Sequence, residues 1–182
     1  MHLPKLRPLL AGLVAAVALA PPALAGPDVP AVPGKIAVEA GHKPFLVGHA
    51  VGVQIYTCRA LPGGYAWSSA TPRATLYDDH GAPIIHHYGG PSWQAKDGST
   101  VVASRVDGVT VDAGAIPWLL LKATPIASAP DADRLGATTF IQRIATTGGL
   151  TPAAADCNAA TAGTVREVDY TADYVFWKGE GA

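Results

Sequence analysis

The stretch HHYGGPSWQAKDGSTVV, residues 86–102, carries the strongest fold signal in the chain. The pair Asp97-Gly98 is typical of the tight turn of a β-hairpin, because Asp bonds to its own backbone and Gly accepts positive φ. A two-residue turn at this pair would place Trp93 opposite Val102, an aromatic ring beside a β-branched side chain. Residues 89–91, GGP, have the composition of a second turn. The stretch therefore predicts antiparallel strands joined by short turns.

Segments of strand length continue on both sides of this stretch, separated by clusters of Gly, Pro, Asp and Asn. Residues 51–58, VGVQIYTC, alternate with period two, so the valines lie on one face and Gln54, Tyr56 and Cys58 on the other. Residues 116–123, IPWLLLKA, are apolar on both faces. This pattern predicts a central strand that is covered on two sides.

The last third of the chain combines a long strand with one short helix. Residues 165–178 read as one long strand or a bent pair. One face of this segment carries Tyr170, Ala172, Tyr174 and Phe176. Thr151-Pro152 opens the run AAADCNAA, where Thr as N-cap and Pro in the first turn predict a short helix. The predicted fold class is mainly β: a single-domain antiparallel β-sandwich or jelly-roll-like barrel with one short helix near the C-terminal third.

The first 25 residues have the organisation of a secretory signal peptide. Lys5 and Arg7 precede an apolar run, and residues 23–25, ALA, form the small-x-small pattern that a signal peptidase accepts. The apolar run is about 11 residues long, whereas a membrane span needs ~20. We predict cleavage near Ala25 and a secreted or periplasmic protein with no integral membrane segment in the mature chain.

After cleavage, the chain is predicted to form one domain that is preceded by a short extended segment. Residues 26–34 are rich in proline, which is typical of an extended lead-in. Residues 35–182 have a length that suits a single β domain. The chain has two cysteines, Cys58 and Cys157, and an oxidising compartment makes a disulfide between them the expected state. A free catalytic thiol is the alternative, although no neighbouring cation or base is evident for either residue.

Charge and motif spacing exclude several classes of function. The formal net charge is −1, with 13 basic and 14 acidic residues, which does not suggest a nucleic-acid partner. The chain has no GxGxxG segment that opens a helix and no GxSxG elbow. Two cysteines far apart cannot make a zinc site by themselves. No cofactor is predicted.

A few polar and aromatic residues remain as candidates for a site. His87 is a candidate general base, metal ligand or ligand-binding residue, and Asp97 could orient it. His86, its neighbour on the same strand, points to the opposite face, so the two cannot hold one metal ion. Trp93 could stack on a ligand, although packing is the commoner use of a strand tryptophan. Arg143 interrupts an apolar strand, where it would pair with a buried carboxylate or, less favoured, bind an anionic ligand.

Seven segments together resemble a family of secreted bacterial and fungal proteins known only as a domain of unknown function, number 3455. These segments are GVQIYTC, YAW, HHYGGPSWQAKDGSTVV, IPWLLLKA, FIQRIATTGGLTP, the second cysteine and ADYVFWK, within residues 51–178. The resemblance makes His87, Gly90, Pro91, Trp93, Asp97, Gly98 and Ser99 the central signature, and matches Cys58 and Cys157 to the family's two cysteines. It implies no established activity. Some fungal members are called malate dehydrogenases, a name that we do not transfer to this chain because the dinucleotide fingerprint is missing.

Two functions from different classes are consistent with these residues. The favoured one is a secreted or periplasmic, non-catalytic ligand-binding or surface-associated protein whose partner is a small molecule or a cell-surface ligand. The alternative is a periplasmic enzyme or metal-binding protein that uses His87 with Asp97. The alternative requires the two side chains to lie within hydrogen-bond reach or to share one cavity, so whether the protein is an enzyme stays open at this point.

Overall fold

The computed structural model describes residues 26–126 and 132–181, and the predicted signal peptide, residues 1–25, lies outside them. The elements in chain order are η1 (Gly34–Ile36), β1 (His42–Leu61), β2 (Gly64–Trp67), β3 (Thr71–Tyr77), β4 (Pro83–Tyr88), β5 (Ser92–Ala95), β6 (Thr100–Val109), β7 (Trp118–Ile126), β8 (Phe140–Gly148), η2 (Ala154–Asp156) and β9 (Val165–Gly179). All strand pairs are antiparallel. The predicted mainly β class is therefore confirmed.

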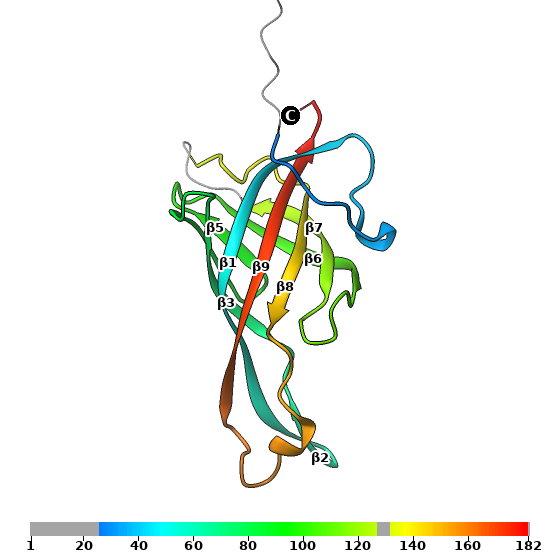
Figure 1. Ribbon diagram of the computed structural model, residues 1–182. Coiled ribbons are helices and arrows are strands. Elements are labelled where there is room, and N and C mark those ends of the chain that lie inside the picture. Colours follow the sequence, from blue (N-terminus) through cyan, green and yellow to red (C-terminus); the bar gives the residue numbers. More distant parts are fainter. Residues whose placement is uncertain (1–25, 127–131, 182) are drawn as a thin grey trace, which may run out of the picture.

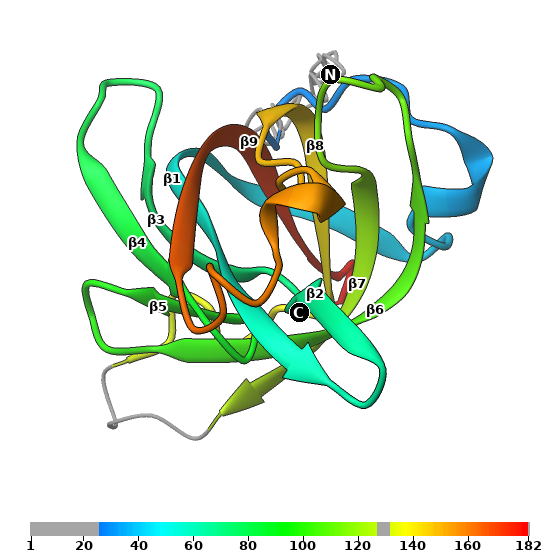
Figure 2. The same ribbon diagram turned by 90° about the horizontal axis from the view of Figure 1, so that it is seen from below.

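The sheet closes on itself through its two longest strands. Each strand from β3 to β8 pairs with the next one in the chain, and β1 pairs with both β3 and β9. Figure 2 shows the resulting ring of strands from the end at which the β1–β2 hairpin projects. The architecture is thus a barrel, as one of the two predicted alternatives has it, and the strands follow each other in sequence without the crossovers of a jelly roll.

Alternation along the strands decides which side chains fill the barrel. On β9 the four residues that the alternation places on one face, Tyr170, Ala172, Tyr174 and Phe176, are all buried, so this face points inward. On β1 the polar-aromatic face with Gln54 and Tyr56 is the buried one, whereas Val51 is 58% exposed on the outside. The remaining core comes from the inward positions of β3 to β8, with Leu76, Ile85, Trp93, Val101, Leu121 and Ile141 as its large members.

A second apolar cluster lies on the outside of the barrel. Ile36 of η1 is 0% exposed and packs with Leu120 of β7 and Phe140 of β8. The Ile36 carbonyl accepts a 2.6 Å hydrogen bond from Gln142 Nε2. Val32, within the segment predicted as an extended lead-in, packs against the same cluster. Strand β7 is consequently covered on both sides, as its sequence predicts, with Leu121 inside and Leu120 under the N-terminal segment.

The β5–β6 turn differs from the predicted two-residue turn. Trp93 lies opposite Val101, not Val102, and Ala95 faces Ser99 through a 2.9 Å hydrogen bond from its N–H to the Ser99 carbonyl. The loop therefore has three residues, the last of which is Gly98 at φ +89°. A left-handed glycine at the third position is the usual way to close a three-residue hairpin loop. The extra residue keeps both Trp93 and Val101 inside the barrel.

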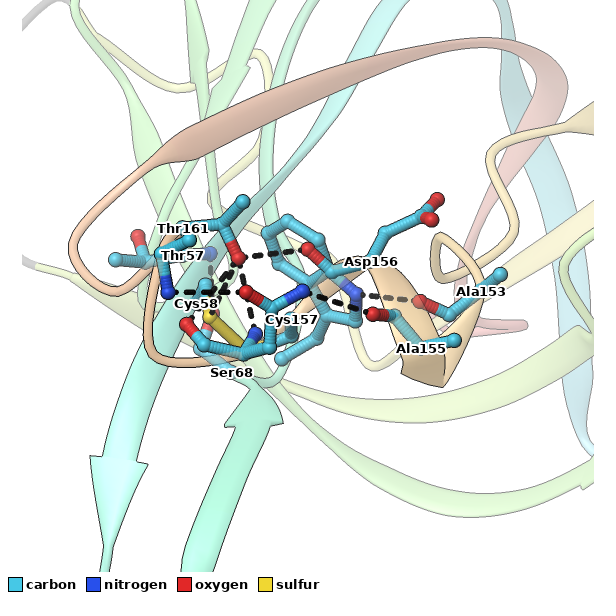
Figure 3. Close-up of a disulfide and its surroundings, with 11 residues drawn as sticks. Thr57, Cys58, Ser68, Ala153, Ala155, Asp156, Cys157 and Thr161 are labelled. Atoms are coloured by element: carbon cyan, nitrogen blue, oxygen red, sulfur yellow. Dashed lines mark hydrogen bonds between the residues drawn. A yellow bond between two sulfur atoms is a disulfide. The ribbon is translucent and has the colours of Figure 1, made fainter.

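The predicted helix is shorter than its sequence suggests. Only η2, a three-residue 3₁₀ turn, forms, and no side chain caps it. Cys157 follows directly after it and joins Cys58 of β1 in the expected disulfide. Figure 3 shows that Thr161 supports this corner, since its hydroxyl donates to the Asp156 carbonyl at 2.8 Å. Figure 1 shows η2 and β2 at the same end of the molecule, where β1 extends beyond the ring of strands.

Candidate functional site: a cavity inside the barrel

The barrel holds a cavity of about 220 Å³ that opens to solvent where its lining residues Thr71, Gly90 and Arg105 are exposed. Its walls come from inward positions of every strand except β2. The lining residues include Gln54, Pro72, His87, Trp93, Arg105, Leu119, Leu121, Arg143 and Tyr174. Its volume is below the ~300–1,000 Å³ usual for pockets that hold drug-sized ligands. The cavity therefore suits a small molecule. All three predicted ligand-binding residues, His87, Trp93 and Arg143, line it.

His87 is held as a neutral imidazole in this wall. It is 3% exposed, and its Nδ1 lies 2.9 Å from the Ser92 carbonyl oxygen. Because a carbonyl only accepts, Nδ1 carries the proton and Nε2 keeps a free lone pair. Burial is the main cause that lowers the pKa of His87 to about 4; the bond to Ser92 opposes this shift and the nearby Arg143 charge adds to it. At neutral pH His87 is thus an uncharged acceptor.

Trp93 is placed against His87 by the register of the β4–β5 hairpin. The two residues are direct cross-strand partners, and their rings stack at 4.3 Å between centroids with an interplanar angle of 9°. Tyr174 meets both rings edge-on, at 5.0 Å from His87 and 5.5 Å from Trp93. This aromatic packing fixes one wall of the cavity as a rigid surface.

Two residues that line the cavity each carry a side-chain donor that has no hydrogen-bond partner among the described residues. These are the indole Nε1 of Trp93 and the amide Nε2 of Gln54, both fully buried. A buried donor without a partner costs about 1–3 kcal/mol, so proteins rarely keep one without a reason. Elsewhere in the described residues, Trp67 and Trp177 use their indole N–H groups to bond Ala153 and Gln142. As far as the chain is described, both residues with an unpartnered buried donor line the cavity.

Arg143 contributes a charge to the same wall. Its Nε and Nη2 atoms donate to the Pro117 carbonyl at 3.1 and 2.8 Å. Within residues 26–126 and 132–181, no carboxylate forms an ion pair with it, so the favoured prediction of a buried carboxylate partner is not what the structure shows. Its partner is instead a backbone carbonyl, and contact with an anionic ligand stays a prediction. Arg105, on β6, brings a second guanidinium to the cavity.

The electrostatic character of the cavity is that of a donor-rich, cationic site. Its lining, as far as the chain is described, contains two arginines and neither Asp nor Glu. Burial raises the pKa of Tyr174 above its usual value, against the effect of Arg143, so its phenol stays protonated. The arrangement can bind an oxygen-rich group through charge and N–H donors, and it offers only the His87 lone pair as a base.

Asp97 makes its hydrogen bonds away from His87, at the β5–β6 turn. Its carboxylate accepts from the Ser99 backbone at 3.0 Å, the Ser99 hydroxyl at 2.7 Å and the Arg134 backbone at 2.9 Å. The bond from the Ser99 hydroxyl is the main cause of its lowered pKa. Asp97 is exposed and is not among the cavity-lining residues. The structure therefore does not bring Asp97 to His87; it uses Asp97 to fasten the hairpin to the segment before β8.

Metal and membrane features give plain negative findings for the described residues. Within residues 26–126 and 132–181, no three side chains of His, Cys, Asp or Glu gather closely enough to hold a metal ion. In that same part of the chain no helix has both the length and the apolar character needed to cross a membrane.

Three cavity residues, Gln54, Arg105 and Tyr174, were not singled out from the sequence as site residues. Gln54 could have been found, because it is a polar side chain on the inward face of a strand whose other inward residues are apolar or aromatic. Arg105 follows Val101 and Ala103 at period two on β6, but it reads as a surface residue beyond the core. Only closure of the barrel places these three beside His87.

Comparisons with known proteins give one match. The model of a family described as "Protein of unknown function (DUF3455)" matches residues 39–178. No curated protein matches the chain, and no solved structure matches it.

Proposed function

The chain belongs to this family of unknown function, DUF3455, and we propose that it is a secreted or periplasmic, non-catalytic binding protein that holds a small molecule inside its barrel. The single observation that carries the proposal is the pair of buried, unpartnered donors on Gln54 and Trp93 in the wall of one cavity. Ligand acceptors that reach these donors would offset the cost of burying them.

Two observations support the proposed location outside the cytoplasm: the signal-peptide pattern and the disulfide. Residues 1–25 have signal-peptide organisation with cleavage near Ala25. The Cys58–Cys157 disulfide supports an oxidising compartment, since such bonds persist mainly in secreted and periplasmic proteins. A ligand met outside the cytoplasm therefore suits this protein.

The non-catalytic character rests on the surroundings of His87. A base with a pKa of about 4 is weak at neutral pH, and effective general bases have a pKa near the working pH. The orienting partner of His87 is the Ser92 carbonyl rather than a carboxylate. His87 in this setting supports a role as an uncharged acceptor for a ligand N–H or O–H group.

Calorimetric titration with three small probes, benzoate, benzamide and benzyl alcohol, tests the proposal. We expect at least one probe to bind with a stoichiometry of one. Leu119→Trp, which fills the cavity from β7, should weaken that binding more than tenfold. Val165→Trp adds the same side chain at an exposed position at the start of β9 and serves as the matched control.

A second variant separates the site from the scaffold. Gln54→Leu removes a buried donor that has no partner, so the free energy of unfolding of the unliganded protein should rise by about 1 kcal/mol while probe binding weakens. The proposal is wrong if none of the probes binds, or if folded Leu119→Trp binds them as well as the wild type does.

A further inference from the structure

We infer that the ligand of this cavity is a small organic carboxylate, whose charged group lies between Arg105 and Arg143 and whose carbon body lies on the apolar wall. This inference rests on the proposed function and names the chemical class of the ligand. The carboxylate would supply the negative charge that the lining of the cavity, as described, does not contain.

The first step concerns the orientation of Arg143. On β8 it pairs with Leu119 of β7 and Tyr174 of β9, so its side chain starts in the middle of the cavity wall. Two of its N–H groups bond to the Pro117 carbonyl, which fixes the plane of the guanidinium. A guanidinium has five N–H donors, so further donors remain after these two bonds. A planar fork held in this way fits a carboxylate.

The second step concerns the balance of charge. Arg143 is half-buried, and a buried charge is costly unless it is paired. Three ionisable neighbours inside the barrel, His87, Tyr170 and Tyr174, do not provide a negative charge, because burial keeps each of them neutral. Arg105, which is exposed, adds a second positive charge at the opening of the same cavity. An anion is therefore the ligand that this charge distribution favours.

The third step separates a carboxylate from other anions. Leu119, Leu121 and Pro72 line the cavity together with the ring of Trp93, so much of the wall is hydrocarbon. Inorganic phosphate has no carbon body to cover this wall, and burial of apolar surface contributes about 25 cal/mol per Å². The cavity of about 220 Å³ is also too small for a long lipid chain. A short amphipathic carboxylate satisfies both the arginines and the apolar wall.

The experiment compares pairs of probes that differ in charge and share a shape: benzoate with benzamide, and hexanoate with hexanamide. We expect the wild type to bind at least one carboxylate more than tenfold tighter than its amide, since hydrogen bonds to charged groups are the stronger ones. Arg143→Gln should remove most of that preference and Arg105→Gln part of it. Arg59→Gln, at an exposed position of β1 that does not line the cavity, should leave it unchanged.

The possible results distinguish failure of the carboxylate inference from failure of the proposed binding function. If probes bind but neither acid binds more tightly than its amide, the carboxylate class is wrong while the binding function stands. If inorganic phosphate binds as tightly as benzoate, the carbon body is wrong. If no probe binds, both fall. If Arg143→Gln does not fold, Arg105→Gln together with Arg143→Lys, which keeps the charge but not the fork, decides the same question.

Discussion

At the scale of the residue, the sequence predicts on which side of its strand His87 lies relative to His86, but not which groups surround it. Its position on a strand beside His86 predicts that the two face opposite ways, and the structure has His87 buried and His86 exposed. What the sequence could not supply is the neighbour that defines its chemistry. The bond to the Ser92 carbonyl and the stack on Trp93 depend on the tight turn of residues 89–91.

Burial of a neutral His87 predicts a loss of stability in acid. The folded pKa of about 4 lies below the usual value of 6.5, so the unfolded chain binds the proton more readily. Stability is therefore unaffected above about pH 6.5 and is lost as the pH falls towards 4, by about 3 kcal/mol in all. Urea unfolding at a series of pH values measures this. His87→Phe should remove that part of the fall, whereas the exposed His86→Gln should retain it; identical profiles for both variants would contradict the assignment.

At the scale of the element, strand faces were predictable and the connections between strands were less so. Period-two alternation sorted the residues of β1 and β9 into two faces, because a half-buried strand must separate them. It did not say which face is inward: on β1 the face with Gln54 and Tyr56 is buried and Val51 is exposed. The length of the β5–β6 turn was not predictable, because Asp97 is held by Arg134, a residue far away in sequence. The predicted helix failed for a similar reason: the disulfide and Thr161 fix the chain after three residues of helix.

The N-terminal segment gives the clearest test at this scale. Proline content predicts that residues 26–34 are extended, but it contains no information on what the following residues pack against. Ile36→Ala should lower the free energy of unfolding by about 2–5 kcal/mol, because Ile36 is wholly buried on the outside of the barrel. Lys35→Ala, one position earlier and exposed, should change it by less than about 0.5 kcal/mol. Equal effects in a denaturant titration would mean that the segment does not pack there.

At the scale of the whole molecule, the barrel brings together site residues that are scattered along the chain. Four different strands supply Gln54, His87, Arg105 and Arg143, so the residues do not belong to one local sequence motif. The sequence predicted three members of the cavity, His87, Trp93 and Arg143, one residue at a time. That they share a cavity follows from closure of β1 onto β9, which no short segment encodes.

The disulfide acts at this scale because it links the early and late parts of the barrel. Cys58 and Cys157 are 99 positions apart, so the bond restricts most of the unfolded chain. For a loop of about 100 residues the chain-entropy contribution is up to about 4.7 kcal/mol. The double variant Cys58→Ala/Cys157→Ala should lose a large part of this in urea unfolding. A reductant should destabilise the wild type and leave the variant unchanged; a free thiol in the unreduced wild type would contradict the bond.

The most direct test of a ligand site inside the barrel is the ¹H–¹⁵N spectrum of the tryptophan indoles during titration with benzoate and, separately, with benzamide. Trp93 Nε1 is the unpartnered donor in the cavity, whereas Trp67 and Trp177 already bond Ala153 and Gln142. We expect the Trp93 resonance to shift with at least one probe, as its N–H gains an acceptor, and the Trp67 and Trp177 resonances to stay in place. A Trp93 resonance that remains fixed at saturating concentrations of both probes would contradict the account.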